Sequence, residues 1–241
     1  MLESLSSVFA DISVPQLALI TAMALIASVV GGVAGYGTGA LMPLVLVPIV
    51  GAEPVVPILS LSALLTNTSR AAAFWPLVDR RRALIVLVAA VPTCVLGAWG
   101  YTLLTGNGAA LVIGAMLVAS VPLRRLMRTR GLALSSRGLA AAGIILLSLL
   151  MAAGLEGAAV VATDAVISIG VGLVKFATFG LAGVVNAKVI AIALLIGGVA
   201  LPGAFLAKAL IERLPLHVHT AILDAVVIGG GAAMVVNAFA R

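Results

Sequence analysis

The chain has 241 residues, of which 63% are hydrophobic and 9% charged, and its net charge is +6. A typical soluble domain is about a quarter charged, because polar side chains must cover much of its surface. The composition therefore excludes a soluble enzyme, a disordered chain and a nucleic-acid-binding domain. We predict an all-α membrane protein.

Apolar segments predict about eight transmembrane helices, since one crossing needs about 20 residues. They cover residues 14–33, 54–75, 83–104, 108–122, 138–153, 158–179, 189–211 and 218–239. A further apolar piece, residues 40–50, is too short to cross a bilayer and contains Pro43 and Pro48. We interpret it as a re-entrant segment, which is tolerated only inside the protein or along a wet cavity.

The distribution of Lys and Arg predicts the orientation. The loop at residues 79–82 holds three arginines and the stretch 124–137 holds five. With eight crossings, both fall on one side together with both termini and the loop near Lys188. The positive-inside rule makes that side cytoplasmic, so we expect a multi-pass protein of the bacterial cytoplasmic membrane with both termini cytoplasmic.

A weak internal repeat relates two four-helix halves. Arg70 and Lys175 are 175 − 70 = 105 positions apart, and so are Phe74 and Phe179. The predicted parts are an N-terminal repeat (1–122), a basic cytoplasmic linker (123–137) and a C-terminal repeat (138–241). Four helices in each half would give both repeats the same orientation. Repeats of this kind are common in secondary transporters, with the site at their interface.

Arg70 and Lys175 are the first candidate site residues, because both lie inside apolar segments. A cation at membrane depth costs about 3 kcal/mol or more and usually faces the interior or a cavity. Thr66 and Asn67 precede Arg70 by four and three residues and so share its helix face. Together these groups suit a small anion. The alternative is that both cations extend to the membrane surface and that the polar residues join helices.

A glycine-rich run at residues 31–39 is the second candidate. Gly35 and Gly37 let the backbone approach a ligand, and Tyr36 and Thr38 add hydroxyl groups. A helix starting here would point its free amides at an anion. Close helix packing is the alternative explanation.

Asp164 is the third candidate and lies eleven residues before Lys175, about 16 Å along a helix. A carboxylate inside the membrane can carry a proton during transport. The alternative is a salt bridge to another helix. His217 and His219 are not spaced to share one helix face, and no cysteine or cluster of carboxylates accompanies them, so they do not predict a metal site. No hydrolase motif is present either. We therefore expect no metal, no cofactor and no enzymatic activity.

The chain resembles the sulfite exporter TauE/SafE family of membrane permeases. The resemblance rests on Gly-Gly-Val-Ala-Gly-Tyr-Gly-Thr-Gly-Ala-Leu-Met-Pro at residues 31–43, the intramembrane arginine, and residues 162–165, 172–175 and 203–208. It implies a small secondary transporter that moves sulfite, organosulfonates or related anions outward. It also implies that the glycine-rich turn, Arg70 and Lys175 fall at the family's recurring polar positions. The second half departs from the family by lacking a clear copy of the glycine motif.

The predicted function is gradient-driven transport of a small anion. Arg70, Lys175, Asn67, Thr66 and the backbone of residues 35–38 would bind the substrate, and Asp164 would couple transport to protons. The predicted partners are this anion and the lipid bilayer, with no nucleic acid, and self-association stays open. The rival functions are a non-transporting membrane scaffold or assembly factor, and an anion channel.

Overall fold

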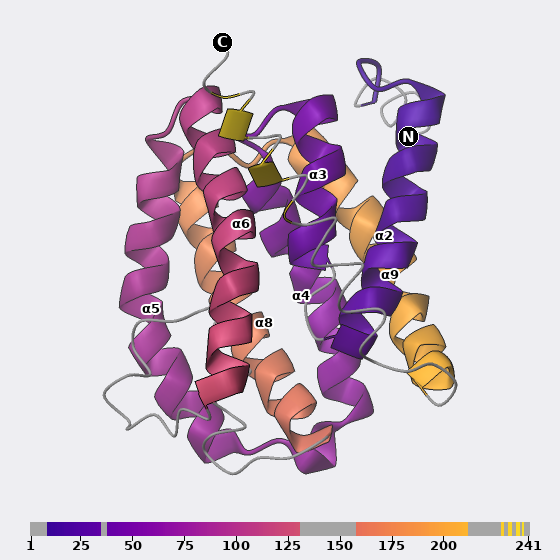
Figure 1. Cartoon of the computed structure of the whole chain (residues 1–241), viewed down its shortest axis with the longest axis vertical. Helices are drawn as coiled ribbons and strands as arrows, with labels where there is room; N and C mark the ends of the chain where they lie inside the picture. Colours follow the sequence, from indigo (N-terminus) through magenta and orange to yellow (C-terminus); the bar gives the residue numbers. More distant parts are fainter. Residues whose placement is uncertain are drawn as a thin grey trace.

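The computed structural model describes residues 9–34, 38–130 and 158–211, and single positions between 228 and 238. These parts form seven α-helices and one 3₁₀-helix, and no strand occurs in them. The helices are α2 (Val14–Ala34), α3 (Thr38–Val50), α4 (Val55–Ala73), η1 (Trp75–Leu77), α5 (Arg80–Thr102), α6 (Gly106–Arg130), α8 (Ala158–Leu181) and α9 (Ala187–Ile211) (Figure 1). The prediction of an all-helical chain is confirmed.

The predicted apolar segments coincide with helices wherever the structure describes them. The largest difference is at α6, which continues to Arg130 and so contains the first part of the predicted basic linker. A helix tolerates these arginines because arginine is among the good helix formers. The predicted span at residues 138–153 and most of the span at 218–239 lie outside the described residues.

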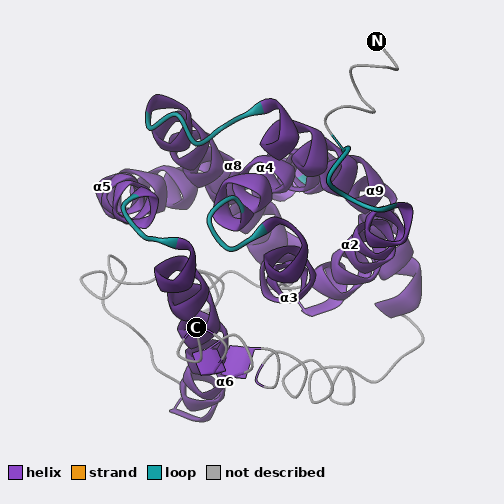
Figure 2. Cartoon of the chain, turned by 90° about the horizontal axis from the view of Figure 1, so that it is seen from above, coloured by secondary structure: helices purple, strands orange, loops and turns teal. Residues whose placement is uncertain are grey.

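Five helices pack side by side in the order α5, α8, α4, α9 and α2 (Figure 2). The short helix α3 packs against α2 and α4, and α6 touches α3. Helices from the two predicted halves therefore alternate across one layer. Glycines allow the close contacts within it: a methyl group on Gly172 of α8 would lie 2.8 Å from Leu64 Cδ2 of α4.

Helices α5 and α8 run in the same direction, and contacts near their ends define the two ends of the bundle. The Asp79 amide, just before α5, donates to the Thr163 hydroxyl near the start of α8 at 3.1 Å. Near the ends of the same helices, the Tyr101 and Phe179 rings meet edge to face at 6.1 Å. We call the end at Asp79–Arg82 the arginine end and the end at Tyr101 and Phe179 the far end.

The predicted placement of the loop near Lys188 is wrong. This loop follows α8 and therefore lies at the far end, opposite the loop at residues 79–82. The Lys188 Nζ pairs with Asp11 Oδ2 at 3.3 Å, so the described chain also begins at the far end. The sequence predicts both on the side of the arginine loop. For the start of the chain the reason is α3, which carries the chain back to the far end, so that α2 and α4 both run towards the arginine end. For Lys188 the difference arises between α5 and α8: three predicted crossings (83–104, 108–122 and 138–153) would start α8 at the far end, whereas it starts beside Asp79 at the arginine end.

The predicted common orientation of the two repeats is also wrong. Arg70 near the end of α4 meets Asp164 near the start of α8, and Leu64 of α4 meets Gly172 further along α8. The two helices are therefore antiparallel. Because the offset of 105 residues aligns α4 with α8, any structural relation between them is an inverted one.

The predicted short helix at residues 40–50 is confirmed as α3. It does not return to the end where it starts, as a re-entrant segment would. α3 runs from the C-terminal end of α2 to the far end of the bundle. There Gly51 takes a positive φ of 83° and lets the chain turn into α4. The Tyr101 hydroxyl donates to the Ala52 carbonyl at 2.6 Å and fixes this turn to α5.

Two of the described helices are long and apolar enough to cross a membrane by length and composition. They are Arg80–Thr102 and the stretch Ala162–Leu181 of α8. In α5, only 17% of the residues in the most apolar stretch are buried. Large apolar side chains therefore cover its outer face, among them Leu84, Val88 and Leu96.

Candidate functional site

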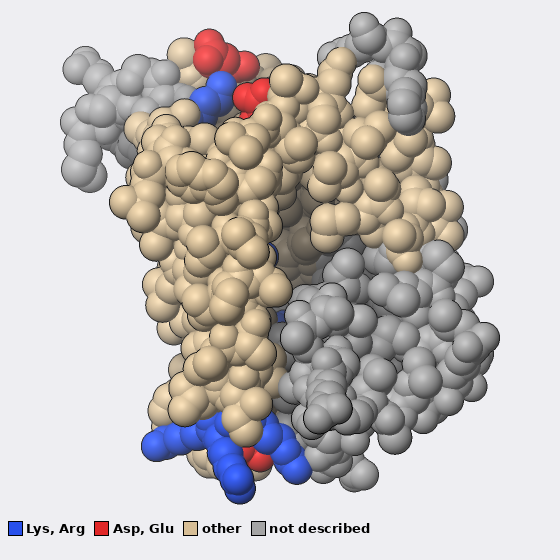
Figure 3. Space-filling model, turned by 90° about the vertical axis from the view of Figure 1, so that its left-hand side faces the viewer, with Lys and Arg blue, Asp and Glu red and all other residues tan. Residues whose placement is uncertain are grey.

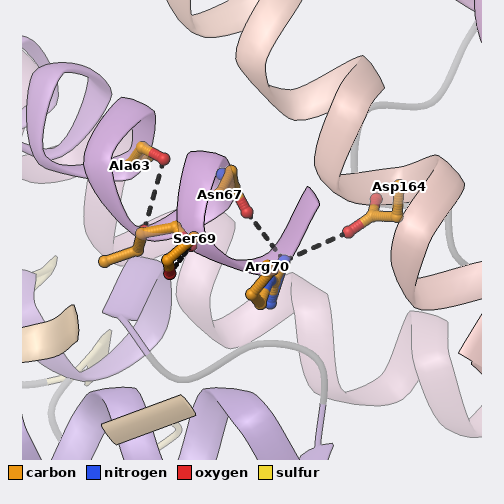
Figure 4. A network of polar contacts seen from close by, with 6 residues as sticks. Ala63, Asn67, Ser69, Arg70 and Asp164 are labelled. Carbon is orange, nitrogen blue, oxygen red and sulfur yellow. Dashed lines mark hydrogen bonds and ion pairs between the residues drawn. The ribbon is translucent and has the colours of Figure 1, made fainter. Parts of the chain in front are cut away.

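Arg70 forms the polar centre of the bundle together with two neighbours. Its Nη2 donates to Asn67 Oδ1, one helical turn earlier, at 2.8 Å. The same nitrogen lies 3.5 Å from Asp164 Oδ2 on α8, which makes an ion pair between the two helices (Figure 4). The structure thus joins three of the predicted site residues. For Asp164, the salt bridge to another helix that the sequence left open is present.

This cluster is largely removed from solvent. The side chains of Arg70 and Asp164 are 19% and 14% exposed, and Asn67 is buried. The Nε of Arg70 is buried and has no hydrogen-bond partner among the described residues. Buried donors are nearly always paired, so this nitrogen is an unused donor beside a buried charge.

Arg70 lies in the last turn of α4, closer to the helix end than the apolar segment suggested. A cation is favoured there because the partial negative charge of the helix dipole lies at this end. The site is therefore near the arginine end of the bundle rather than at its middle. The neighbouring Trp75 ring lies under the Arg80 guanidinium, 5.3 Å from ring centroid to Cζ.

Thr66 uses its hydroxyl within its own helix. The oxygen donates towards the carbonyls of Ser62 and Ala63 at 3.4 and 3.3 Å. Ser69 likewise donates to the Thr66 carbonyl at 2.9 Å, as Figure 4 shows for this turn of α4. Of the polar side chains near Arg70 on α4, Asn67 is therefore the one that reaches the guanidinium.

The start of α8 is held in place by Thr163, which sequence reasoning did not single out as a site residue. Its buried hydroxyl accepts the Asp79 amide, and Asp79 in turn caps α5 by accepting from the Arg82 amide at 2.9 Å. Because Asp164 is the next residue, this contact holds Asp164 at the level of Arg70 in the bundle. The aspartate directly before a helix start at Arg80 was a recognisable capping signal.

Lys175 does not join Arg70. It follows Asp164 by eleven residues, which places it about 16 Å further along α8 towards the far end. At that level α8 contacts α5 through the Cys94 thiol, which donates to the Val171 carbonyl at 3.7 Å. Within the described part of the chain, Lys175 forms no hydrogen bond or ion pair.

The glycine-rich run falls between two helices. Gly31 and Gly32 belong to the last turns of α2, and Thr38 begins α3. Gly35, Tyr36 and Gly37 lie outside the described residues. Thr38 forms no hydrogen bond with Arg70, Asn67 or Asp164 among the residues that the structure describes. The role of this run in binding stays a prediction.

No group of His, Cys, Asp and Glu suited to a metal ion occurs in the described ranges. His217 and His219 lie outside them. The fold and the cluster together define an all-helical bundle with an arginine–aspartate pair between two antiparallel helices. No model of a known protein family, no curated protein and no solved structure matches the chain. The resemblance to sulfite exporters therefore stays a prediction.

Proposed function

We propose that the chain is a multi-pass protein of the bacterial cytoplasmic membrane, with about eight crossings. The outer face of α5 supports this, because six of its large apolar side chains are exposed and α5 carries no charge after Arg82. Exposed apolar surface of this extent is costly in water and favourable in lipid. The orientation that follows from the positive-inside rule has the arginine end in the cytoplasm and residue 11 outside.

The distribution of charge supports the same placement. On the face that Figure 3 shows, Lys and Arg gather at one end, acidic residues lie mainly at the other, and the outer surface between them is almost entirely uncharged. The arginine end carries Arg80, Arg81 and Arg82, and the far end carries Asp11 and Lys188. Trp75 is half-exposed beside Arg80, which is typical of a side chain at a membrane surface.

We further propose that the protein is a gradient-driven secondary transporter of small anions, sulfite or organosulfonates, and acts as an exporter. The observation that carries this is the largely buried Arg70 side chain, whose Nε–H has no partner within the part of the chain that the structure describes. Arginine binds oxyanions through two parallel N–H groups, and a buried site strengthens that attraction. The position of Arg70 near the arginine end would let a cytoplasmic anion reach it first.

The antiparallel contact between α4 and α8 adds support. In secondary transporters with inverted repeats, the substrate site lies where the two repeats meet. Arg70 and Asp164 lie at the contact between the two helices that the offset of 105 residues relates. In this proposal Arg70 and Asn67 bind the anion, Asp164 responds to protons, and Lys175 acts at a different level of the path.

The test is anion flux in proteoliposomes that contain the full chain. Arg70→Ala should lower sulfite and methanesulfonate flux by at least about tenfold, because a hydrogen bond to a charged group contributes about 1.5–3 kcal/mol. Arg70→Lys should recover only part of the flux, since lysine cannot bind with two parallel donors. Lys188→Ala is the matched control, because this cation lies at the far end and pairs with an exposed aspartate. Equal flux in wild type and Arg70→Ala would refute the site.

A membrane scaffold is the second candidate, and one observation favours it. Arg70 and Asp164 neutralise each other and could serve only to hold α4 against α8. The variant Arg70→Leu/Asp164→Leu separates the two functions, because it can keep the helices packed without the charges. A folded double variant without flux supports the transporter. A channel would instead show flux that does not saturate with anion concentration.

A further inference from the structure

We propose that Asp164 is an internal competitor of the transported anion, so that the anion and a proton bind together. Asp164 neutralises Arg70 in the empty site. When Asp164 takes up a proton, Arg70 becomes free for the anion, and one proton accompanies one singly charged anion. This inference rests on the proposed transport function and specifies how its site is coupled.

The geometry of the guanidinium is the first support. Nε and Nη2 of arginine point in parallel and form the edge that binds an oxyanion with two hydrogen bonds. Within the described ranges Nε has no partner, and Nη2 is shared between Asn67 and Asp164. Asp164 uses one oxygen at 3.5 Å, longer than the roughly 2.9 Å of a strong charged contact. Asp164 is therefore an incomplete ligand, and an oxyanion on the same edge would satisfy both nitrogens.

The balance of charge is the second support. Arg70 and the Asp164 carboxylate sum to zero, which suits a site with both side chains more than four-fifths buried. An anion added to this pair would leave a net negative charge away from water, and such charges are strongly disfavoured. If the anion arrives with a proton on Asp164, the site is neutral both before and after binding. The two ligands therefore favour each other's binding.

The surroundings leave Arg70 as the charged group that acts on Asp164 among the described residues. On α4, Arg70 faces the Asp164 carboxylate, and η1 contributes no titratable group. At the start of α5, Asp79 and Arg82 pair with each other at 3.2 Å. Cys94 and Tyr101 of α5 pack against α8 further towards the far end. Lys175 on α8 itself lies three turns away.

The experiment measures binding of methanesulfonate to the full-length protein in nanodiscs as a function of pH. A sulfonate keeps its single charge throughout the range in which carboxylates titrate, so any change reports on the protein. Wild-type affinity should rise as pH falls. Asp164→Asn should bind about tenfold more tightly than wild type at neutral pH, within the usual range of coupling between two ligands, and should lose the pH dependence. Asp79→Asn, the control at the surface pair, should keep it.

A second measurement needs no variant. In weakly buffered solution, methanesulfonate binding to the wild type should take up close to one proton per anion. Binding without proton uptake, or an unchanged pH dependence in Asp164→Asn, overturns this inference and leaves the transport proposal standing. Loss of binding in folded Asp164→Asn also overturns it, since Asp164 would then be a ligand or a positioning residue. Absence of binding at every pH in the wild type overturns both proposals.

Discussion

Removing one member of the pair between α4 and α8 should destabilise the protein far more than removing a member of an exposed pair. At a separation of 3.5 Å and an effective dielectric constant of about 20, the gross attraction between Arg70 and Asp164 is about 5 kcal/mol. Most of this offsets the cost of burying both charges. Asp164→Ala removes the attraction and leaves the arginine buried without a counter-charge, which costs about 3–5 kcal/mol.

The pair of Asp11 and Lys188 is the matched control. Its separation is 3.3 Å, close to that of the buried pair, but the Asp11 side chain is 84% exposed. Asp11→Ala should therefore cost less than about 1 kcal/mol. In thermal unfolding in detergent micelles, Asp164→Ala should lower Tm by about 6 °C or more, and Asp11→Ala by about 2–4 °C at most.

The double variant Arg70→Leu/Asp164→Leu completes the test. Replacing a buried ion pair by apolar residues is often neutral or stabilising, so most of the lost Tm should return. Equal shifts for Asp164→Ala and Asp11→Ala would refute the reasoning, because they would mean that burial does not distinguish the two pairs. A double variant as unstable as Asp164→Ala would show that the side chains matter for packing rather than charge.

Three further predictions concern the membrane, the topology and the packing. The two tryptophans of the chain, Trp75 and Trp99, are both about half exposed. Brominated lipids should therefore quench the fluorescence of each single-tryptophan variant. Quenching of neither would contradict the membrane placement. In a cysteine-free background, cysteines at Arg81 and Ala182 should react with an impermeant maleimide from opposite sides of the membrane, and reaction from one side would restore the topology predicted from sequence. Gly231→Ala should cost about 1–3 kcal/mol in unfolding experiments, because its methyl group would lie 2.9 Å from a leucine Cβ and 3.0 Å from a carbonyl oxygen of α6; a change within error would mean that this contact relaxes.

The helices were predictable because each apolar segment is long and is ended by charge, glycine or proline. Arg80 begins α5 directly after a capping aspartate, and α8 ends at a turn where Gly183 takes a positive φ of 74°. Both signals act within a few residues and can be read from the sequence. The direction of each helix could not be read in this way. One short helix, α3, makes α2 and α4 run in the same direction, and hydropathy does not say whether 13 residues turn back or continue.

The members of this polar cluster were predictable from the sequence, but their pairing was not. Arg70, Asn67 and Asp164 stood out because polar residues are rare in these segments. Asn67 and Arg70 could be joined because their spacing of three residues is local. Asp164 is 94 positions from Arg70, and its partner depends on how α8 packs against α4. Composition and spacing carry no information on that contact.

Because α4 and α8 are antiparallel, the matched sequence positions of Arg70 and Lys175 do not bring the two cations into one site. If the helices had run in the same direction, Arg70 and Lys175 would lie at one level and could hold one anion together. Because they are antiparallel, the equivalent positions lie towards opposite ends. Applying the offset of 105 to Asp164 gives 164 − 105 = 59, which is Leu59, so Lys175 has no matching acid on α4. The cation near the arginine end is therefore neutralised within the protein, whereas the one nearer the far end has no such partner on α4. Arg70 and Lys175 therefore lie at different levels of the bundle and cannot hold one anion together.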